Sequence, residues 1–352
     1  MKFTAVTAAL VGSALATPFS FPLSNGFPNP STDVIGLIQQ HAGGTLPNTP
    51  LPKDVTPDVV TALQLIAANE IFEVAYFTEL YHNITNHIHG YDLAKYNKTF
   101  VVDAIHRIRA QEELHGLGAN AILKSVGSQP IPPCKYEFPV TTFEDAIALA
   151  NTFTDVVLGV LPQVQLLGGT KGGKDGSSLI PLIGSILGQE AEQDGWFRTL
   201  LGKPPSAAPF LTPTTPQFAL AAVSMFLVPG SCPPVYNDIT KKIGALAPLT
   251  VASISEQKSE AQFSVKGKLD AKHNALVYVS GQSAPVTVDI QNVQTKGGVT
   301  TFSAAFPYKI TATSGFAEGL SVAAVTKCKR AYANVADVAT DTLFGPGLIE
   351  RH

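Results

Sequence analysis

The feature that most constrains the fold is a pair of polar residues in the middle of an otherwise apolar face of a predicted helix. We call such a face a seam. In the run VVDAIHRIRAQEELHGLGANAILKSV, alternating steps of four and three residues select Val101, Ile105, Ile108, Glu112, His115, Ala119, Ile122 and Val126. This spacing is typical of the inward face of a bundle helix. We therefore expect Glu112 and His115 to point into the core.

Two further stretches repeat this pattern. The first selects Val59, Leu63, Ile66, Glu70, Glu73, Phe77, Leu80 and Ile84, and the second Leu179, Ile183, Ile186, Glu190, Gln193, Phe197 and Leu200. Three helices should thus bring carboxylates to about mid-height of one core. An unpaired buried carboxylate costs several kcal/mol unless it is protonated, hydrogen-bonded or bound to a cation.

A fourth helical stretch lacks the carboxylate. Its seam reads Phe143, Ile147, Ala150, Thr154, Val157, Leu161 and Val164, with Asp155 one step off. Four long helices with a polar layer predict a four-helix bundle over residues 56–235. The spacing that defines the seams does not select Glu113 or Glu192, and we expect both to face solvent.

The hydrophobic period changes after Pro248. Short runs rich in β-branched and aromatic residues follow, separated by Gly, Asn, Lys and Ser. They predict a small β-sandwich over residues 247–330 and a tail over 331–352. Residues 17–55, rich in Pro, Gly, Asn and Thr, are expected to form an extended arm on the bundle. The predicted fold class is mainly α with a C-terminal β domain.

The N-terminus has the features of a secretory signal. Lys2 precedes an apolar run that ends in Ala14-Leu15-Ala16, a small-x-small cleavage site. We expect residues 1–16 to be removed, and no later stretch to hold the roughly 18 or more apolar residues needed to span a bilayer. The mature protein is therefore expected to be secreted and soluble, with N-glycosylation sequons at Asn83 and Asn97.

Three cysteines allow one internal disulfide. Cys134 and Cys232 each follow a predicted helix in a Pro-bounded loop, so we pair these two and leave Cys328 unassigned. The alternative is three buried thiols, which an oxidising compartment disfavours.

Composition and motifs exclude several functions. A formal net charge of -3 is too near neutrality to indicate nucleic acid or a membrane surface as partner. The glycine-rich run GGTKGGKDG lacks the ending of a phosphate loop, and we find no hydrolase triad. We accordingly assign no catalytic residue and no residue that binds an organic cofactor.

The segments NEIFEVAYF, RAQEELHG and GQEAEQDGWFR resemble the ferritin-like superfamily and, within it, the secreted fungal proteins of late sexual development and stress response. The resemblance covers about residues 50–235, the signal peptide and the loops of Cys134 and Cys232. It implies an up-down-up-down bundle with a crossover, and di-iron members of the superfamily bind two metals at its centre.

Carried over residue by residue, the resemblance implies a ligand set. Glu70 or Glu73 would be the carboxylate of the first helix, Glu112 the bridging carboxylate and His115 the imidazole ligand of the second. In the fourth helix Glu190 would bridge and Gln193 would stand in place of a second histidine, as in some ferritins.

The third helix departs from the family pattern. Ala150 and Thr154 occupy positions where a glutamate is expected, and Glu73 is the available substitute. The alternative to a metal site is a remnant, with His115 protonated between carboxylates and Gln193 and Trp196 supplying hydrogen bonds.

Two functions follow from these alternatives. The first is a non-catalytic secreted or cell-wall protein of fungal development or stress, with a partial metal site and a β domain that binds an extracellular partner. The second is an iron- or manganese-dependent oxidoreductase or a metal-storage protein. We favour the first, because the third helix lacks its ligand.

Overall fold

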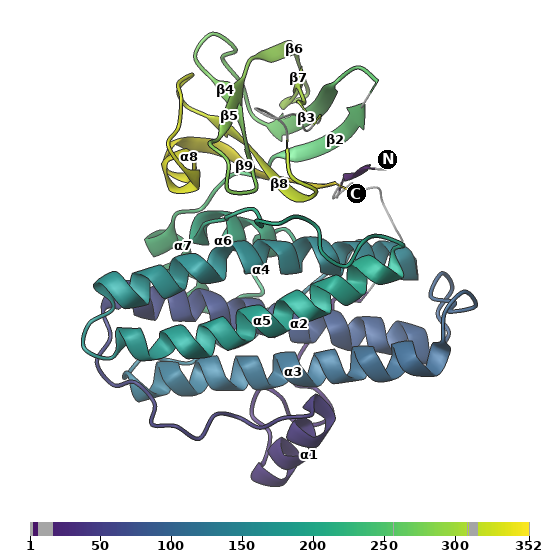
Figure 1. Cartoon of the computed structure of the whole chain (residues 1–352), viewed down its shortest axis with the longest axis vertical. Coiled ribbons are helices and arrows are strands. Elements are labelled where there is room, and N and C mark those ends of the chain that lie inside the picture. The colour runs from purple at the N-terminus through teal and green to yellow at the C-terminus, as the bar shows by residue number, and fades with distance from the viewer. Residues whose placement is uncertain (1–2, 6–16, 256, 308, 310–315, 352) are drawn as a thin grey trace.

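The computed structural model describes residues 3–5, 17–255, 257–307, 309 and 316–351. A layer of long helices carries a β domain on one side, and two short helices, α6 and α7, lie between them (Figure 1). The predicted signal peptide, residues 1–16, lies outside the described residues except for the short strand β1, Phe3–Ala5.

The bundle consists of four helices, α2 (Pro57–Thr85), α3 (Lys98–Ser125), α4 (Phe143–Lys171) and α5 (Leu179–Leu200). Polar residues fix where two of them begin. The Asn97 side chain accepts a hydrogen bond from the backbone N–H of Phe100, and the Thr142 hydroxyl accepts one from the N–H of Asp145. These bonds satisfy N–H groups that have no partner within the helix. A 3₁₀ turn, η1 (Gly176–Ser178), leads into α5.

Helices α2 and α4 form the centre of the molecule. Every residue of α2 from Ala62 to Phe77 is buried. By length and hydropathy both helices qualify as membrane spans, but 78% and 83% of their most apolar windows lie inside the fold. They are apolar on every face because other elements cover every face. The prediction of no apolar run of membrane length overlooked both helices, because Glu70 and Asp155 interrupt them.

The N-terminal segment packs along α3. It is less extended than predicted, because it contains helix α1 (Thr32–Ala42), which the Ser31 hydroxyl caps and Gly43 ends at φ 76°. Ile38 and Ala42 of α1 pack on Ala110 and Leu114 of α3.

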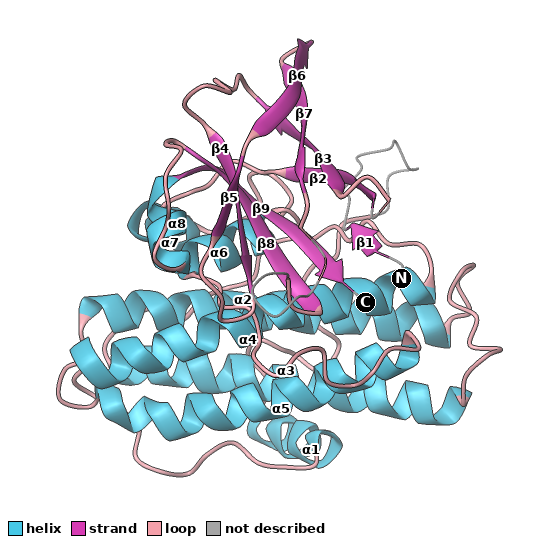
Figure 2. Ribbon diagram, turned by 45° about the horizontal axis from the view of Figure 1, so that its top comes forward, coloured by secondary structure: helices cyan, strands magenta, loops and turns pink. Residues whose placement is uncertain are grey.

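Helices α6 (Pro216–Ser224) and α7 (Pro234–Ile243) cover the side of the bundle that faces the β domain (Figure 2). A disulfide joins Cys134, which follows α3, to Cys232, which precedes α7. These are the two cysteines paired in the prediction. Cys328 is free and exposed.

Two antiparallel sheets form the β domain. One has the order β1-β9-β8-β4-β5 and the other β2-β3-β7-β6. The strands are β2 (Thr250–Ser255), β3 (Glu260–Lys266), β4 (Ala275–Ser280), β5 (Val286–Val288), β6 (Ile290–Lys296), β7 (Val299–Ala305), β8 (Gly319–Thr326) and β9 (Thr342–Arg351). Strands β4 and β8 are buried throughout, since one face meets the other sheet and the opposite face meets the bundle.

The prediction of a tail over residues 331–352 is wrong. This segment contains helix α8 (Val335–Asp341) and strand β9, which pairs with β8 on one side and β1 on the other. The sequence analysis did not predict strand β9 because it contains Gly345, Pro346 and Gly347, and glycine and proline are depleted in strands. Gly347 is closely packed: a Cβ on it would lie 3.1 Å from the side chains of Leu249 and Val251, which would have to shift slightly.

The disulfide gives a stability prediction. It closes a loop with a sequence separation of 98 residues, so replacing Cys134 and Cys232 together with alanine should lower the free energy of unfolding by about 3–5 kcal/mol. Urea denaturation followed by circular dichroism measures the loss. Cys328→Ser is the matched control and should leave stability unchanged, because this side chain is exposed and forms no disulfide.

Candidate metal centre

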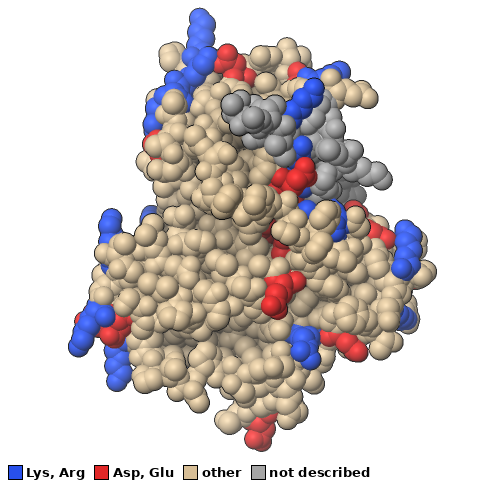
Figure 3. Space-filling view, in the orientation of Figure 1, with Lys and Arg blue, Asp and Glu red and all other residues tan. Residues whose placement is uncertain are grey.

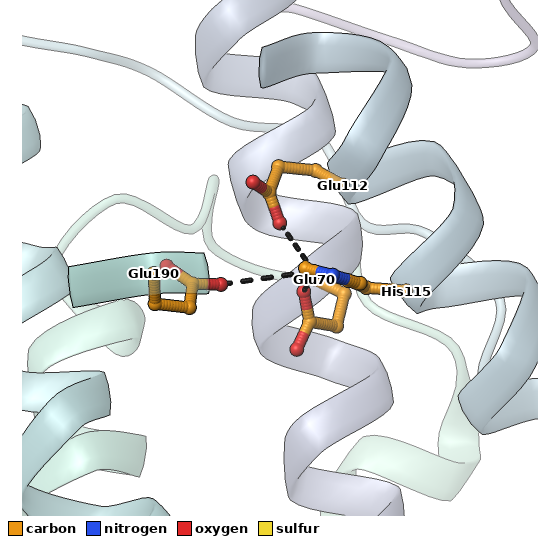
Figure 4. A group of neighbouring side chains, drawn as sticks. All are labelled: Glu70, Glu112, His115 and Glu190. Carbon is orange, nitrogen blue, oxygen red and sulfur yellow. Dashed lines mark hydrogen bonds and ion pairs between the residues drawn. The ribbon is translucent and has the colours of Figure 1, made fainter. Parts of the chain in front are cut away.

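Three helices bring a carboxylate and imidazole cluster to the middle of the bundle. Glu70 comes from α2, Glu112 and His115 from α3, and Glu190 from α5. One ligand atom from each lies within 4.8 Å of all the others. Figure 4 shows Glu70 and Glu190 approaching the Glu112 and His115 pair from their own helices.

The imidazole of His115 lies among the three carboxylates of this cluster. Its Nδ1 lies 2.8 Å from Glu112 Oε2, 3.3 Å from Glu70 Oε2 and 3.7 Å from Glu190 Oε1. The three carboxylates are at most 1% exposed, whereas the His115 side chain is 15% exposed. The cluster therefore lies in the dry core, and its histidine is closest to solvent.

A chain of amides orients Glu112 from the α5 side. Gln193 Nε2 donates a hydrogen bond to Glu112 Oε1 at 2.6 Å and reaches Gln111 Oε1 at 3.3 Å. Gln189 Nε2 also donates to Gln111 Oε1, at 3.1 Å. Gln193 thus lies beside the four-residue cluster as a hydrogen-bond donor to one of its members.

Glu73 lies one turn beyond Glu70 on the same face of α2. Its Oε1 accepts a hydrogen bond from Asn69 Nδ2 at 3.0 Å, and its Oε2 is buried without a hydrogen bond. It is close enough for its charge to act on Glu112 and Glu70. Glu73 is therefore a neighbour of the four-residue group rather than a member.

Burial and crowding shift the titration of the cluster. Burial, countered by His115, raises the pKa of Glu70 to about 7. Burial and the nearby carboxylates raise the pKa values of Glu73 and Glu190 well above 4.5. Burial opposes the charging of His115, but the charges of Glu112 and Glu70 outweigh it and raise the pKa of this imidazole well above 6.5.

Several oxygens of the cluster and its neighbour Glu73 are incompletely satisfied. Both carboxylate oxygens of Glu190 and Oε2 of Glu73 are buried without a hydrogen bond, and Glu70 Oε2 has only the His115 imidazole, 3.3 Å away. Buried polar atoms normally have a partner, so oxygens of this kind indicate a bound proton or a cation. Oxygen donors with one imidazole are ligands that iron, manganese and zinc accept. The residues present fit one such cation.

Helix α4 contributes no carboxylate at this level. Ala150 and Thr154 are fully buried there, as the seam predicted. Asp155 is also buried, but it lies near Asn151 of α4 and Glu350 of β9, away from the cluster. On the α4 side of the centre, the only polar side chain at these two positions is therefore the hydroxyl of Thr154.

The expectation for Glu113 is wrong. This side chain is 1% exposed and accepts a hydrogen bond at 2.8 Å from Asn25 Nδ2, while Arg109 Nε lies 3.4 Å from its other oxygen. The N-terminal segment covers this face of α3, which the spacing of apolar residues within α3 could not reveal. Glu192 is exposed as predicted.

The remaining predicted residues lie away from the centre. Trp196 packs on Phe100 and Phe197, with ring centroids 6.3 and 5.7 Å away. Asn97 is exposed at the start of α3, and Asn83 is half-buried near the end of α2. Their glycosylation stays a prediction.

Fold and site together define the class of the helical part: a four-helix bundle with a carboxylate and histidine cluster at its centre. Residues 58–203 match the ferritin-like domain family, and this match spans α2 to α5. It supports placing the bundle in the ferritin-like superfamily, while the β domain lies outside it. No curated protein matches the chain.

The raised pKa values predict how the metal-free protein responds to pH. Each shifted group holds its proton more tightly in the folded chain than in the unfolded chain, so stability falls as pH rises. For the carboxyl groups, the decrease in the free energy of unfolding begins near pH 4.5, and for Glu70 it continues through about pH 7. His115 adds to the decrease above pH 6.5. Chelator-treated protein should be less stable to urea by about 1 kcal/mol or more at pH 7.5 than at pH 5.

Glu190→Gln tests this origin of the pH dependence. Burial and the nearby carboxylates raise the pKa of Glu190 well above 4.5 and so favour its protonated form, and an amide of the same shape should change stability at pH 5 by less than about 1 kcal/mol. It should also flatten the dependence on pH. An unchanged slope would contradict the assigned protonation state.

Proposed function

We propose that this protein is a secreted, non-catalytic ferritin-like protein that binds one divalent metal ion, iron or manganese, in its bundle. The ligands are Glu70, Glu112, His115 and Glu190. The observation that carries the proposal is the convergence of four donor atoms within 4.8 Å in a dry core, with carboxylate oxygens that no hydrogen bond satisfies. A bound cation would supply the missing partner.

The incomplete ligand set supports a non-catalytic role. An oxygen-activating pair of ions needs ligands on both sides of the centre, but α4 offers Ala150 and Thr154. Gln193, where a second histidine would stand, donates to Glu112 through its amide nitrogen. Donors for a second ion are therefore few.

A di-metal oxidoreductase or storage protein is the second candidate, and Glu73 favours it. Its Oε2 is buried without a hydrogen bond, and its charge reaches Glu112. With both oxygens of Glu190, it could hold a second ion on the α2 side. An iron or manganese pair would supply redox chemistry there.

Secretion and the fungal developmental or stress context belong to the same proposal. The Cys134–Cys232 disulfide is compatible with an extracellular protein, and the sequence resemblance supplies the context. On the face in Figure 3, charges of both signs are scattered over a largely uncharged surface, which suits a protein or cell-wall partner of the β domain better than a polyanion.

Removal of the Glu112 and His115 side chains tests the metal site. Replacing Glu112 and His115 together with leucine should abolish stoichiometric iron or manganese in protein purified from its secreting host, as measured by elemental analysis. The melting temperature should then no longer rise when metal is added. Glu113→Gln is the matched control, since this buried carboxylate lies outside the cluster.

Metal-free wild-type protein that takes up neither ion would refute the metal site. If the cluster is only a remnant, the leucine pair should be neutral or stabilising.

The affinity for metal should depend on pH. Protons compete with the cation for Glu70 and Glu190, so manganese should bind at least about tenfold more tightly at pH 8 than at pH 6. Calorimetry in buffers of different ionisation enthalpy would record the release of protons. Affinity that is constant over this range would show that the cation does not displace them.

Stoichiometry separates the two candidate functions. One ion per chain, unchanged by Glu73→Gln, fits the single-cation site. Two ions per chain, falling to one in this variant, would establish the di-metal alternative.

A further inference from the structure

A second buried polar cluster lies where the bundle meets the β domain. Its members come from α4, α5, the segment after α5, and β9: Asn151, Asp155, Asp194, Arg198, Lys203 and Glu350. All of them except the half-buried Lys203 are at most 4% exposed. Strand β8 closes the cluster, because a Cβ on Gly319 would lie 3.8 Å from Asp155 Oδ2 and 2.8 Å from Ala207 Cβ.

The amide of Asn151 is held between an amine and two carboxyl groups. Lys203 Nζ lies 3.5 Å from Asn151 Oδ1. On the other side, Asn151 Nδ2 lies 2.5 Å from Asp194 Oδ1 and 3.5 Å from Asp155 Oδ2. The Lys203 amine is therefore next to the carbonyl of a fixed carboxamide, and a carboxyl group is next to the amide nitrogen.

Arg198 holds the lysine segment in place. Its Nε donates to the carbonyl oxygen of Pro204 at 2.9 Å, and its Nη1 donates to Glu350 Oε1 at 3.3 Å. Lys203 thus sits on a backbone that is fixed to both α5 and β9. Such fixed approach favours a reaction between neighbouring groups.

The environment also favours the reactive protonation states. Burial, opposed mainly by Glu350, lowers the pKa of Lys203 to about 8, so part of the amine is neutral near neutral pH. Burial and the charge of Glu350 raise the pKa of Asp155 well above 3.8, which favours the protonated carboxyl group that such a reaction needs as a proton donor.

We propose that Lys203 and Asn151 join in an intramolecular isopeptide bond. The neutral Nζ attacks Cγ of Asn151, forming the new C–N bond. The bond from Cγ to Nδ2 breaks, Asp155 protonates the departing nitrogen, and the proton released by Nζ returns to Asp155. The products are a secondary amide and one ammonia, and no oxidant or cofactor is consumed.

The isopeptide bond would stabilise the junction between the helical bundle and the β domain. It joins α4 to a segment 52 residues further along the chain. This segment continues to Thr212, whose hydroxyl accepts a hydrogen bond from the N–H of Gly281 at 2.7 Å and donates to the carbonyl of Leu320. The covalent link would therefore lie beside the contacts that hold β4 and β8.

Peptide mapping of the reduced full chain tests the proposal. Trypsin does not cleave before Pro204, so Lys203 falls in fragment 199–241 and Asn151 in fragment 136–171. We expect the two fragments as one branched species, lighter than their sum by one ammonia. A succinimide at Asn151 would also lose ammonia, but it would leave the fragments separate.

Matched variants locate the chemistry. Lys203→Arg keeps the charge and should give only separate, unmodified fragments, whereas Lys174→Arg, at an exposed lysine, should leave the branched species intact. Asp155→Asn should slow the reaction at least about tenfold while the folded state, checked by circular dichroism, persists. Separate and unmodified wild-type fragments, even after the folded protein has stood for days at about pH 8, would overturn the proposal.

Discussion

The burial of the Glu112 and His115 pair is the constraint on which the helical part depends. An ion pair taken out of water must recover its lost hydration from close partners. Here the carboxylate receives the imidazole at 2.8 Å on one oxygen and the Gln193 amide at 2.6 Å on the other. Gln193 of α5, and Glu70 of α2, whose Oε2 lies 3.3 Å from His115 Nδ1, therefore fix the heights of both helices relative to α3.

Helix α5 serves two polar sites at once. Glu190 and Gln193 face the carboxylate and imidazole cluster, while Asp194 and Arg198 face the junction with the β domain. Successive residues of an α-helix point about 100° apart, so neighbours such as Gln193 and Asp194 can reach different sides. Helix α5 therefore buries charge on two faces, and its sequence is less apolar than that of α2 or α4.

Much of the fold and the centre of the site could be predicted from the sequence. The three seams identified Glu70, Glu112, His115 and Glu190, because polar side chains inside an apolar spacing are stable only when they meet one another in the core. What stayed hidden depended on contacts between distant segments. Glu113 is buried by the N-terminal segment, and strand β9 forms from residues that seldom occur in strands. The cluster around Asn151 needs α4, α5 and β9 together, so no single stretch of sequence shows it.

The hydrophobic core has a consequence for how the protein can be divided. Val277, Val322 and Leu348 of the β domain belong to the same continuous core as the residues of α2 and α4. A bundle produced alone would expose the apolar surface that these strands cover, and such surfaces promote association. The change from helix to strand near residue 247 is thus a change of architecture within one continuous hydrophobic core.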